Sequence, residues 1–253
     1  MGTNITQAEI AAYCAALLAD EKASGTVQKY QRDLTAFVRW LGGRMATKET
    51  AAGWKLHLLQ QGYAPRSINS MLAAVNGFFA YRNWPIRVKF LKVQRQLFRD
   101  TSRELIRAEY DRLLTAARES GQERLALIME TLCATGIRIS ELRYLTVEAA
   151  RAGRSTIALK GKIRTILLPS KLCRKLLKYA KKQKIASGEV FLTRSGRSIS
   201  RRQVWFELKR LCKAAGVEPG KVFPHNFRHL FATTFYRVSH DIVKLADVLG
   251  HSS

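Results

Sequence analysis

The sequence predicts a mainly α-helical protein of two domains, with a small antiparallel β-hairpin in the C-terminal domain. Residues 1–85 carry an apolar period of three to four residues, residues 86–102 are basic without a clean period, and two β-rich runs flank residues 160–162. The 253 residues, 47% of them hydrophobic, provide core for one large or two modest domains. We therefore expect a helical domain at 1–90, a basic linker at 91–102 and a second domain at 103–253.

The first domain reads as helices at 8–23, 26–43, 47–62 and 64–84. In the second of these, apolar residues recur at three- and four-residue steps, which places one face against a core. These residues are Tyr30, Leu34, Phe37, Val38 and Leu41. Glycines 42 and 43 end that helix, and Pro65 and Pro85 mark the start and the end of the fourth. Glycine after a helix and proline at its first position or beyond its end are typical of helix boundaries.

The stretch "IRVKFLKVQRQLFRDTS" separates this domain from a fresh helix start at "TSRELIRAEYDRLL". Its basic residues, among them Lys92 and Arg95, form either an ordinary solvated face or a strap along a phosphate backbone. The large positive charge of the whole chain favours the strap.

The second domain mixes helices with a hairpin. Helices at 107–120 and 123–136 lead into "IRISELRYL", and "STIALKGKIRTILLP" predicts two strands around the turn at 160–162. A strongly basic amphipathic helix, "SKLCRKLLKYAKKQK", follows, with Leu172, Leu176, Leu177 and Ala180 on its apolar face. A short strand "EVFLT", a helix at 200–213 and two last helices, "PHNFRHLFATTFYRVS" and "DIVKLADVLGHSS", complete the pattern.

The net charge is +25, from 44 Lys and Arg against 19 Asp and Glu. Residues 1–100 hold 14 basic and 6 acidic residues and the rest hold 30 and 13, so both domains are basic rather than one tail. Such a field concentrates polyanions, and nucleic acid is the first expectation. We do not expect a membrane partner, because no apolar stretch approaches the roughly 20 residues that span a bilayer. The N-terminus lacks signal-peptide order, and we expect a cytoplasmic, nucleoid-associated protein.

Four cysteines (Cys14, Cys133, Cys173 and Cys212) lie far apart in helix-like apolar patterns without a close pair. Zinc ribbons and disulfide frameworks need close spacing, so we expect reduced core thiols, and neither a metal nor a cofactor.

The segment "CATGIRISEL" places Arg138 at the start of a helical turn, with Glu141 three residues on. An arginine beside a positive helix N-terminus is poorly placed for helix stability but suits an anion held between them. Taken alone, the pair also fits an ordinary surface ion pair.

In "PHNFRHLFAT", His225 and Arg228 share a helix face, with Pro224 at the first helical position. His229, four residues after His225, raises the alternative of a metal site, but a zinc-protease glutamate and a third ligand are lacking. Each histidine by itself fits an ordinary core or surface position.

Lys160 and Lys162 stand at the hairpin turn, where a solvated turn is the plain alternative. His251 follows Gly250, where a helix C-cap is equally ordinary.

Together and in this order, "ATGIRISEL", the hairpin lysine, "PHNFRHLFAT" and "LGHSS" resemble the tyrosine recombinase (phage integrase) family. The resemblance covers 101–253, and the helical segment with "TVQKYQRDLTAFVRWL" is similar to that family's core-binding domain. It implies a two-domain DNA clamp in which Arg138 and Arg228 grip the scissile phosphate and Glu141 braces the site. It also implies roles for His225, for His251 and for a hairpin lysine, which is Lys160 or, in another register, Lys162.

These residue types suit the cleavage of a phosphodiester without a metal. Planar guanidiniums offer paired donors to the equatorial oxygens of a five-coordinate phosphorane. The hairpin lysine would give a proton to the departing 5′ oxygen, and His225 would take the nucleophile's proton or hydrogen-bond the phosphate. His251 would hold a nonbridging oxygen, and Glu141 would orient His225 or Arg138.

The family's nucleophile is a tyrosine two to three helical turns after the "LGH" histidine, which forms a 3′-phosphotyrosyl link so that rejoining needs no ATP. All eight tyrosines here lie elsewhere, and Tyr236 fits a packing aromatic better than a substitute. We therefore expect the chain to bind double-stranded recombination-site DNA without cleaving it. The resemblance also implies a tetrameric synapse, which we expect to be weakened here. The alternatives are a non-catalytic site-specific DNA-binding protein and a type IB topoisomerase-like enzyme.

For base contacts we nominate the 200–213 helix, through Arg201, Arg202 and Gln203, and the 64–81 helix, through Arg66 and Asn69. Plain phosphate anchoring is the alternative for the two arginines, and their loss would then weaken all DNA sequences equally. The choice among integration, excision and dimer resolution stays open.

Overall fold

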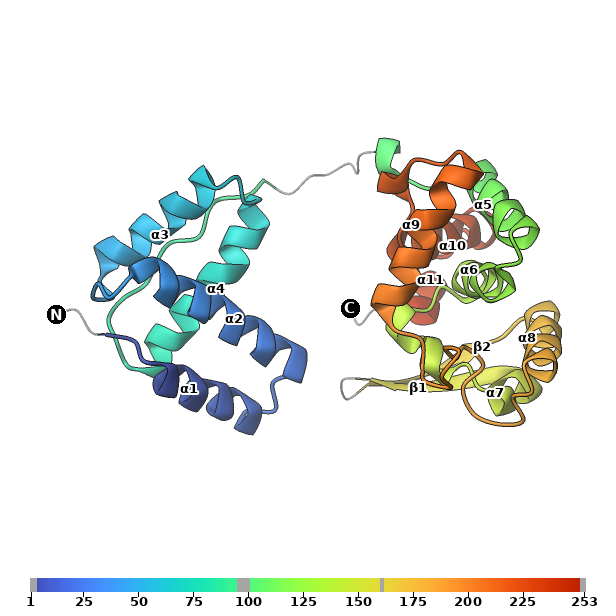
Figure 1. The fold of residues 1–253 in the computed structure, drawn as a ribbon, viewed down its shortest axis with the longest axis horizontal. Helices are drawn as coiled ribbons and strands as arrows, with labels where there is room; N and C mark the ends of the chain where they lie inside the picture. Colours follow the sequence, from blue (N-terminus) through green and yellow to red (C-terminus); the bar gives the residue numbers. More distant parts are fainter. Residues whose placement is uncertain (1–3, 95–100, 160–161, 251–253) are drawn as a thin grey trace. The chain divides into compact units, whose positions relative to one another are not determined.

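The computed structural model describes residues 4–94, 101–159 and 162–250 and divides the chain into two compact units, Met1–Leu97 and Phe98–Ser253 (Figure 1). Each unit has its own apolar core. The predicted fold class, mainly helical with one small antiparallel hairpin, is confirmed.

The described part of unit 1 is built from helices whose bounds lie within a few residues of those expected. They are α1 (Gln7–Ala19), α2 (Ser24–Leu41), α3 (Lys48–Gln60) and α4 (Pro65–Tyr81). Thr6 caps α1 through a capping box, in which Glu9 N donates to Thr6 Oγ1 over 3.2 Å and Thr6 N donates to Glu9 Oε2 over 2.8 Å. The core is aromatic, with Phe37 and Trp54 fully buried and their ring centroids 4.9 Å apart.

An extended segment after α4 packs on that helix. Asn76 Nδ2 donates to Val88 O and Val88 N donates to Asn76 Oδ1, both over 2.9 Å. Two turns earlier, Asn69 makes the same pair of bonds to Leu91, over 2.9 and 2.7 Å. Val88 is buried, and Leu91 packs against the core of unit 1. The first part of the aperiodic stretch therefore packs on unit 1 as extended backbone, and two asparagine side chains hydrogen-bond to it at Val88 and Leu91.

Unit 2 is also mainly helical. Its described helices are α5 (Arg107–Glu119), α6 (Glu123–Thr135), α7 (Val147–Ala152), α8 (Ser170–Lys182), α9 (Arg201–Ala215), α10 (Pro224–Ser239) and α11 (Ile242–Leu249), with short 3₁₀ helices η1 (Thr101–Arg103), η2 (Ile139–Tyr144) and η3 (Pro219–Lys221). Helix α6 is buried along most of its length and packs against α5, α8 and α10. A helix that is apolar nearly all round belongs in the middle of a bundle.

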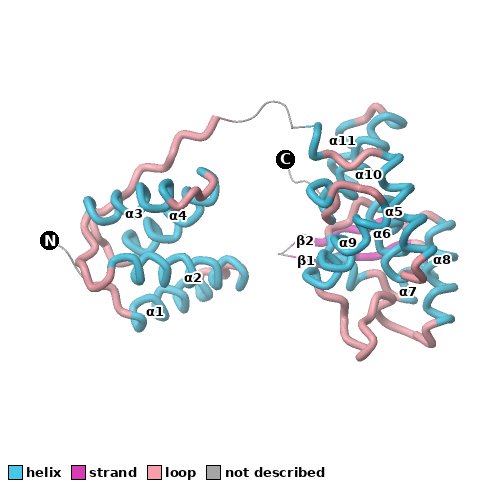
Figure 2. Tube along the Cα trace, turned by 45° about the horizontal axis from the view of Figure 1, so that its top comes forward, coloured by secondary structure: helices cyan, strands magenta, loops and turns pink. Residues whose placement is uncertain are grey.

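The predicted hairpin is present. Strands β1 (Arg154–Leu159) and β2 (Lys162–Leu167) pair antiparallel, with Leu159 opposite Lys162. Figure 2 shows these strands as the β-structure of a chain that is otherwise helix and loop among the described residues. Ile166 is buried while Ile163 and Leu167 are exposed, so β2 alternates between a core face and a solvent face.

One local expectation in unit 2 is wrong. The segment "EVFLT" forms no strand, because its residues reach only isolated bridges, Thr146 to Glu189 and Leu192 to Ser198. Its apolar run has another cause, since Val190 and Phe191 are buried in the core as part of a loop. The helical turn expected after Arg138 is present as the 3₁₀ helix η2.

All four cysteines lie in the described part of the chain and are unpaired. Burial raises the pKa of the Cys133 thiol to about 12, which makes it a poor nucleophile. Among the described residues, no helix combines the length and apolar character that crossing a membrane requires.

Candidate active site

The C-terminal end of α6 turns sharply at Gly136, which has a positive φ of 62°. A Cβ atom at this glycine would stand 2.4 Å from Phe231 Cδ1 and 3.0 Å from Leu249 Cδ2. Gly136 therefore allows α10 and α11 to approach the end of α6 closely, as well as adopting the left-handed conformation.

Arg138 follows this turn and caps η2, with Glu141 at the third position of that helix. Arg138 N donates to Glu141 Oε2 over 2.7 Å, and Arg138 Nη1 donates to Glu141 Oε1 over 3.1 Å. The Glu141 side chain is 1% exposed and that of Arg138 is 44% exposed. A buried carboxylate thus holds the backbone and the side chain of an arginine that still reaches solvent.

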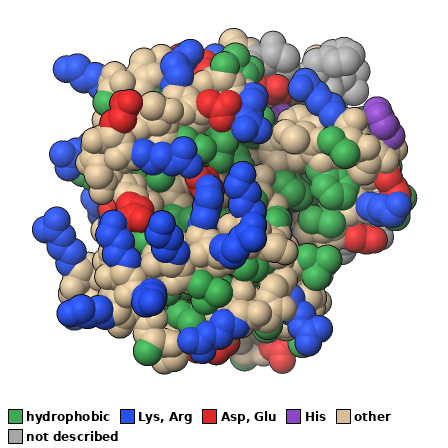
Figure 3. All heavy atoms as spheres, turned by 90° about the vertical axis from the view of Figure 1, so that its right-hand side faces the viewer, with side chains coloured by type: hydrophobic (Ala, Val, Ile, Leu, Met, Phe, Trp, Pro, Cys, Tyr) green, Lys and Arg blue, Asp and Glu red, His purple; other side chains and the backbone are tan. Residues whose placement is uncertain are grey.

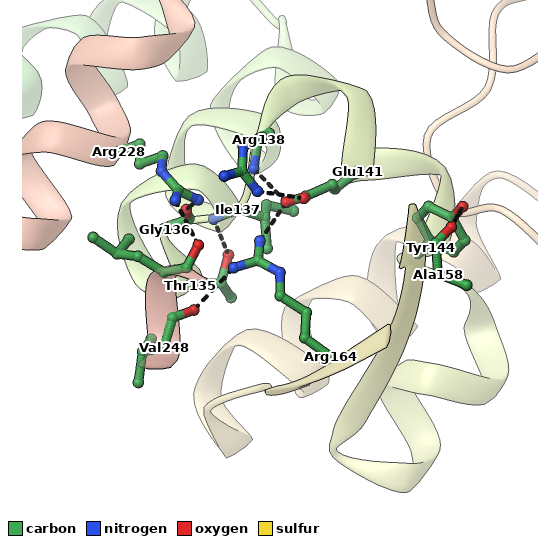
Figure 4. A network of polar contacts seen from close by, with 11 residues as sticks. Thr135, Gly136, Ile137, Arg138, Glu141, Tyr144, Ala158, Arg164, Arg228 and Val248 are labelled. Carbon is green, nitrogen blue, oxygen red and sulfur yellow. Dashed lines mark hydrogen bonds and ion pairs between the residues drawn. The ribbon is translucent and has the colours of Figure 1, made fainter. Parts of the chain in front are cut away.

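A second arginine, Arg164 of β2, binds the same carboxylate (Figure 4). Arg164 Nη2 donates to Glu141 Oε2 over 2.6 Å, and Arg164 Nη1 donates to Val248 O over 3.1 Å at the end of α11. Arg164 was not among the residues predicted from the sequence. The strand pattern could have indicated it, because Arg164 lies two residues before buried Ile166 and so shares its inward face. A charged side chain on that face needs a partner.

Arg228 lies in the first turns of α10 and is 5% exposed. Its Nη1 donates to Gly136 O, the end of α6, and its Nη2 donates to Leu249 O over 2.6 Å, the end of α11. The pKa of Arg228 is lowered to about 10, chiefly by burial and also by the positive charges of Arg138 and Arg164, against the opposing effect of Glu141.

The structure therefore brings together Arg138, Glu141 and Arg228 from distant parts of the sequence, and adds Arg164 (Figure 4). The described cluster holds three guanidinium groups against one carboxylate. Like charges held close together repel one another, and a bound anion offsets this repulsion. Planar donors facing one region suit a phosphate group.

His225 is the second residue of α10, one turn before Arg228, and is exposed. His229 faces elsewhere: its Nε2 lies 3.0 Å from Glu104 Oε1. The described residues contain no group of three or more His, Cys, Asp or Glu side chains arranged to hold a metal ion.

Three predicted residues, Arg95, Lys160 and His251, lie outside the described residues. Lys162 is the first residue of β2, and only its backbone is described. Tyr236 is half-exposed on α10, where its ring lies edge-on to His240 with 6.1 Å between centroids.

In unit 1, Arg66 lines an open pocket of about 550 Å³ between α2 and α4. Lys29 and Arg32 also line this pocket, and both pair with the buried carboxylate of Asp33. The pocket is thus lined by three basic side chains, and two of them, Lys29 and Arg32, pair with one buried acid. The amide of Asn69 hydrogen-bonds to the backbone of Leu91, and the base contact predicted for this residue stays a prediction.

In unit 2, Arg201 and Arg202 are exposed at the start of α9, and Gln203 donates to Glu207 Oε1 over 3.1 Å. Lys92 is exposed after the extended segment of unit 1. Figure 3 shows Lys and Arg side chains spread over the face of unit 2 that lies to the right in Figure 1. Exposed basic residues of α8 are Lys171, Arg174, Lys178, Lys181 and Lys182.

Family models match both units. The model described as "Phage integrase family" matches residues 103–253, and that described as "Phage integrase, N-terminal SAM-like domain" matches residues 10–84. Tyrosine recombinase XerA of Thermococcus kodakarensis is 30% identical over 240 residues, which cover 92% of this chain and 82% of the relative. Tyrosine recombinase XerD of Halalkalibacterium halodurans is 28% identical over 258 residues, covering 91% and 84%.

Solved structures share the fold at low identity. A lambda integrase tetramer bound to a Holliday junction has a TM-score of 0.77 and 19% identity, over 100% of this chain and 76% of the other. The XerH site-specific recombinase bound to its difH substrate has a TM-score of 0.73 and 19% identity, over 99% and 80%. The two family models and the relatives, which are tyrosine recombinases, lead to one conclusion: this chain belongs to the phage integrase family.

Proposed function

We propose that these 253 residues form the DNA-binding and phosphate-gripping parts of a site-specific recombinase that works through a 3′-phosphotyrosyl intermediate, without metal or ATP. The arginine cluster around buried Glu141 is the observation that carries this proposal. The family membership supports the reaction class.

In this proposal Arg138 and Arg228 bind nonbridging oxygens of one DNA phosphate. Arg228 is held by two backbone carbonyls and Arg138 by Glu141, so both guanidiniums are oriented before DNA arrives. Preorganised donors of this kind are worth about 3 to 4 kcal/mol each in the transition state. Removing either one would slow cleavage by at least about 100-fold.

The chemical step needs two proton transfers. A tyrosine hydroxyl oxygen attacks phosphorus, the bond from phosphorus to the 5′ oxygen breaks, and the tyrosine remains joined to the 3′ phosphate. Lys160, or Lys162 in its place, gives a proton to the departing 5′ oxygen, and His225 takes the tyrosine's proton or hydrogen-bonds the phosphate. His251 holds a nonbridging oxygen. The phosphotyrosyl bond retains the energy of the broken linkage, so rejoining is the reverse step.

None of the tyrosines of this chain is the nucleophile in our proposal. Tyr236 pairs with His240, and Tyr144 donates its hydroxyl to Ala158 O over 2.6 Å. The 253 residues alone therefore bind the site and form no covalent link. Related structures include a recombinase tetramer on a Holliday junction, and we propose the same assembly for the active synapse.

Sequence choice would come from α9, through Arg201, Arg202 and Gln203, and from Arg66 in unit 1. Lys92 and Arg95 would contact phosphates of the DNA backbone. Phosphate contacts set affinity and register, while few base contacts set the choice of site.

The test begins with selection of a binding site from a random duplex library, followed by footprinting. The selected duplex is then nicked so that cleavage releases a short fragment and traps any covalent product. We expect tight, salt-sensitive binding and no covalent protein–DNA adduct. An adduct formed by any of the eight tyrosines would refute the assignment of the nucleophile, and failure to enrich a sequence would refute site-specific binding.

A further inference from the structure

We infer that Arg164 is a positioning residue that keeps Arg138 and the end of α11 in the geometry that receives the scissile phosphate. The inference rests on the proposed function of the arginine cluster. Arg164 adds a residue on β2 to a site whose other described members come from η2 and α10.

Arg164 connects two structural elements with one planar group. Nη2 binds Glu141 Oε2 over 2.6 Å, and Nη1 binds Val248 O over 3.1 Å. Its stem also lies against Gly250, where an added Cβ would stand 2.6 Å from Arg164 Cδ. Gly250 has a positive φ of 62° and ends α11. A glycine is therefore favoured at this position both by the backbone conformation and by the space that the Arg164 side chain occupies.

Arg164 also balances the charge of Glu141. The two oxygens of Glu141 are shared: Oε1 accepts from Arg138 Nη1, while Oε2 accepts from Arg138 N and from Arg164 Nη2. Without Arg164, the buried carboxylate would have Arg138 as its sole cationic partner among the described contacts. Glu141 would then hold the Arg138 guanidinium more strongly and compete with a DNA phosphate for it.

The exposed fractions of the two arginine side chains agree with these two roles. Arg164 is 16% exposed and Arg138 is 44% exposed, although both bind the same acid. The better buried arginine neutralises the acid, and the more exposed one remains available to an anion. A lysine at 164 would keep the charge but would lack the fork that reaches both Glu141 and Val248.

The experiment measures binding rather than cleavage and therefore needs no nucleophile. The probes are selected site duplexes, each with one phosphate replaced by a neutral methylphosphonate, scanned across the footprint. For each linkage we take the ratio of Kd for the neutral duplex to Kd for the charged duplex. In the wild-type chain we expect one linkage with a ratio of about 10 to 100, the size of charge-assisted hydrogen bonds, and a ratio near one there for Arg138→Ala.

The variants to compare are Arg164→Gln, Arg164→Lys and, as the matched control, Arg154→Gln. Arg154 is an exposed arginine on the partner strand of the same hairpin. We expect Arg164→Gln to lower the ratio about 10-fold, as for members of one interaction network. Arg164→Lys should recover part of the loss, and Arg154→Gln should match wild type at this linkage.

A purely structural role for Arg164 gives a different result. Arg164→Gln would then lower the melting temperature, but at 25 °C, well below that temperature, the ratio would stay at the wild-type value, and this overturns the inference alone. A ratio for Arg164→Gln equal to the ratio for Arg154→Gln would also overturn the inference. If no linkage shows charge dependence in the wild-type chain, or Arg138→Ala leaves the dependence intact, the proposed function fails and the inference fails with it.

Discussion

Substitution of Gly136 by alanine tests the close junction of α6, α10 and α11 that frames the site. The residue has φ +62°, and the new Cβ would lie 2.4 Å from a ring carbon of Phe231 and 3.0 Å from a methyl of Leu249. The left-handed conformation costs about 1 to 2 kcal/mol for a residue with a Cβ. Overpacking adds about 1 to 3 kcal/mol. Together these give a loss of about 2 to 5 kcal/mol in the unfolding free energy of unit 2.

Gly153→Ala is the matched control, because Gly153 also has a positive φ, of 67°, and nothing lies within 4 Å of its added Cβ. This variant should lose only the conformational part, about 1 to 2 kcal/mol. For a unit of this size, 1 kcal/mol corresponds to about 3 °C, so calorimetry should show losses of about 6 to 15 °C for Gly136→Ala and about 3 to 6 °C for Gly153→Ala. Equal melting temperatures for the two variants would refute the steric account of the junction.

Three further predictions concern the other parts of the molecule. Asn76→Ala leaves the buried backbone of Val88 without its side-chain partner. We therefore expect a loss of about 2 kcal/mol in unfolding free energy and much faster amide exchange at Val88. Unchanged exchange would contradict the role of Asn76 in holding the extended segment. Burial raises the pKa of Tyr13 to about 12 from 10.0, so between these pH values the unfolded chain loses the phenol proton while the folded chain keeps it. The unfolding free energy should therefore fall as pH rises from 10 toward 12. Urea unfolding should show a smaller fall for Tyr13→Phe than for the wild-type chain, and an equal fall would contradict the raised pKa of Tyr13 as its cause. Arg202→Ala should reduce the slope of log K against log salt by about 0.9 if Arg202 contacts a phosphate, whereas an unchanged slope with relaxed sequence choice would indicate base contact instead.

Much of the helical framework follows from local pattern. The apolar period of α2 and its glycine stop predicted that helix to within a few residues, and the β-rich runs in 155–169 predicted the hairpin. These signals are local, because a helix or a hairpin is set by neighbours in sequence. The apolar run at Val190 and Phe191 shows where local pattern fails. A buried loop and a buried strand can have the same apolar sequence, so the sequence could not distinguish them.

The site was predictable where it is local and not where it is assembled by tertiary contacts. Arg138 with Glu141, and His225 with Arg228, stand at helix spacings that put them near one another. Arg164 is 23 residues from Glu141, and no local rule joins them.

Asn69 also has a partner that the sequence does not reveal. The sequence gives a polar residue three positions after Arg66, whereas the structure shows its amide hydrogen-bonded to a backbone segment 22 residues away. Local pattern cannot reveal a hydrogen-bond partner that tertiary folding supplies.

The convergence of Arg138 and Arg228 on one phosphate is tested most directly by the methylphosphonate scan with Arg138→Ala, Arg228→Lys and the double variant. Both single variants should lose charge dependence at the same linkage, and the double variant should lose little more than either one, because residues that hold one group are not additive. Loss at two different linkages, or additive losses, would contradict the account.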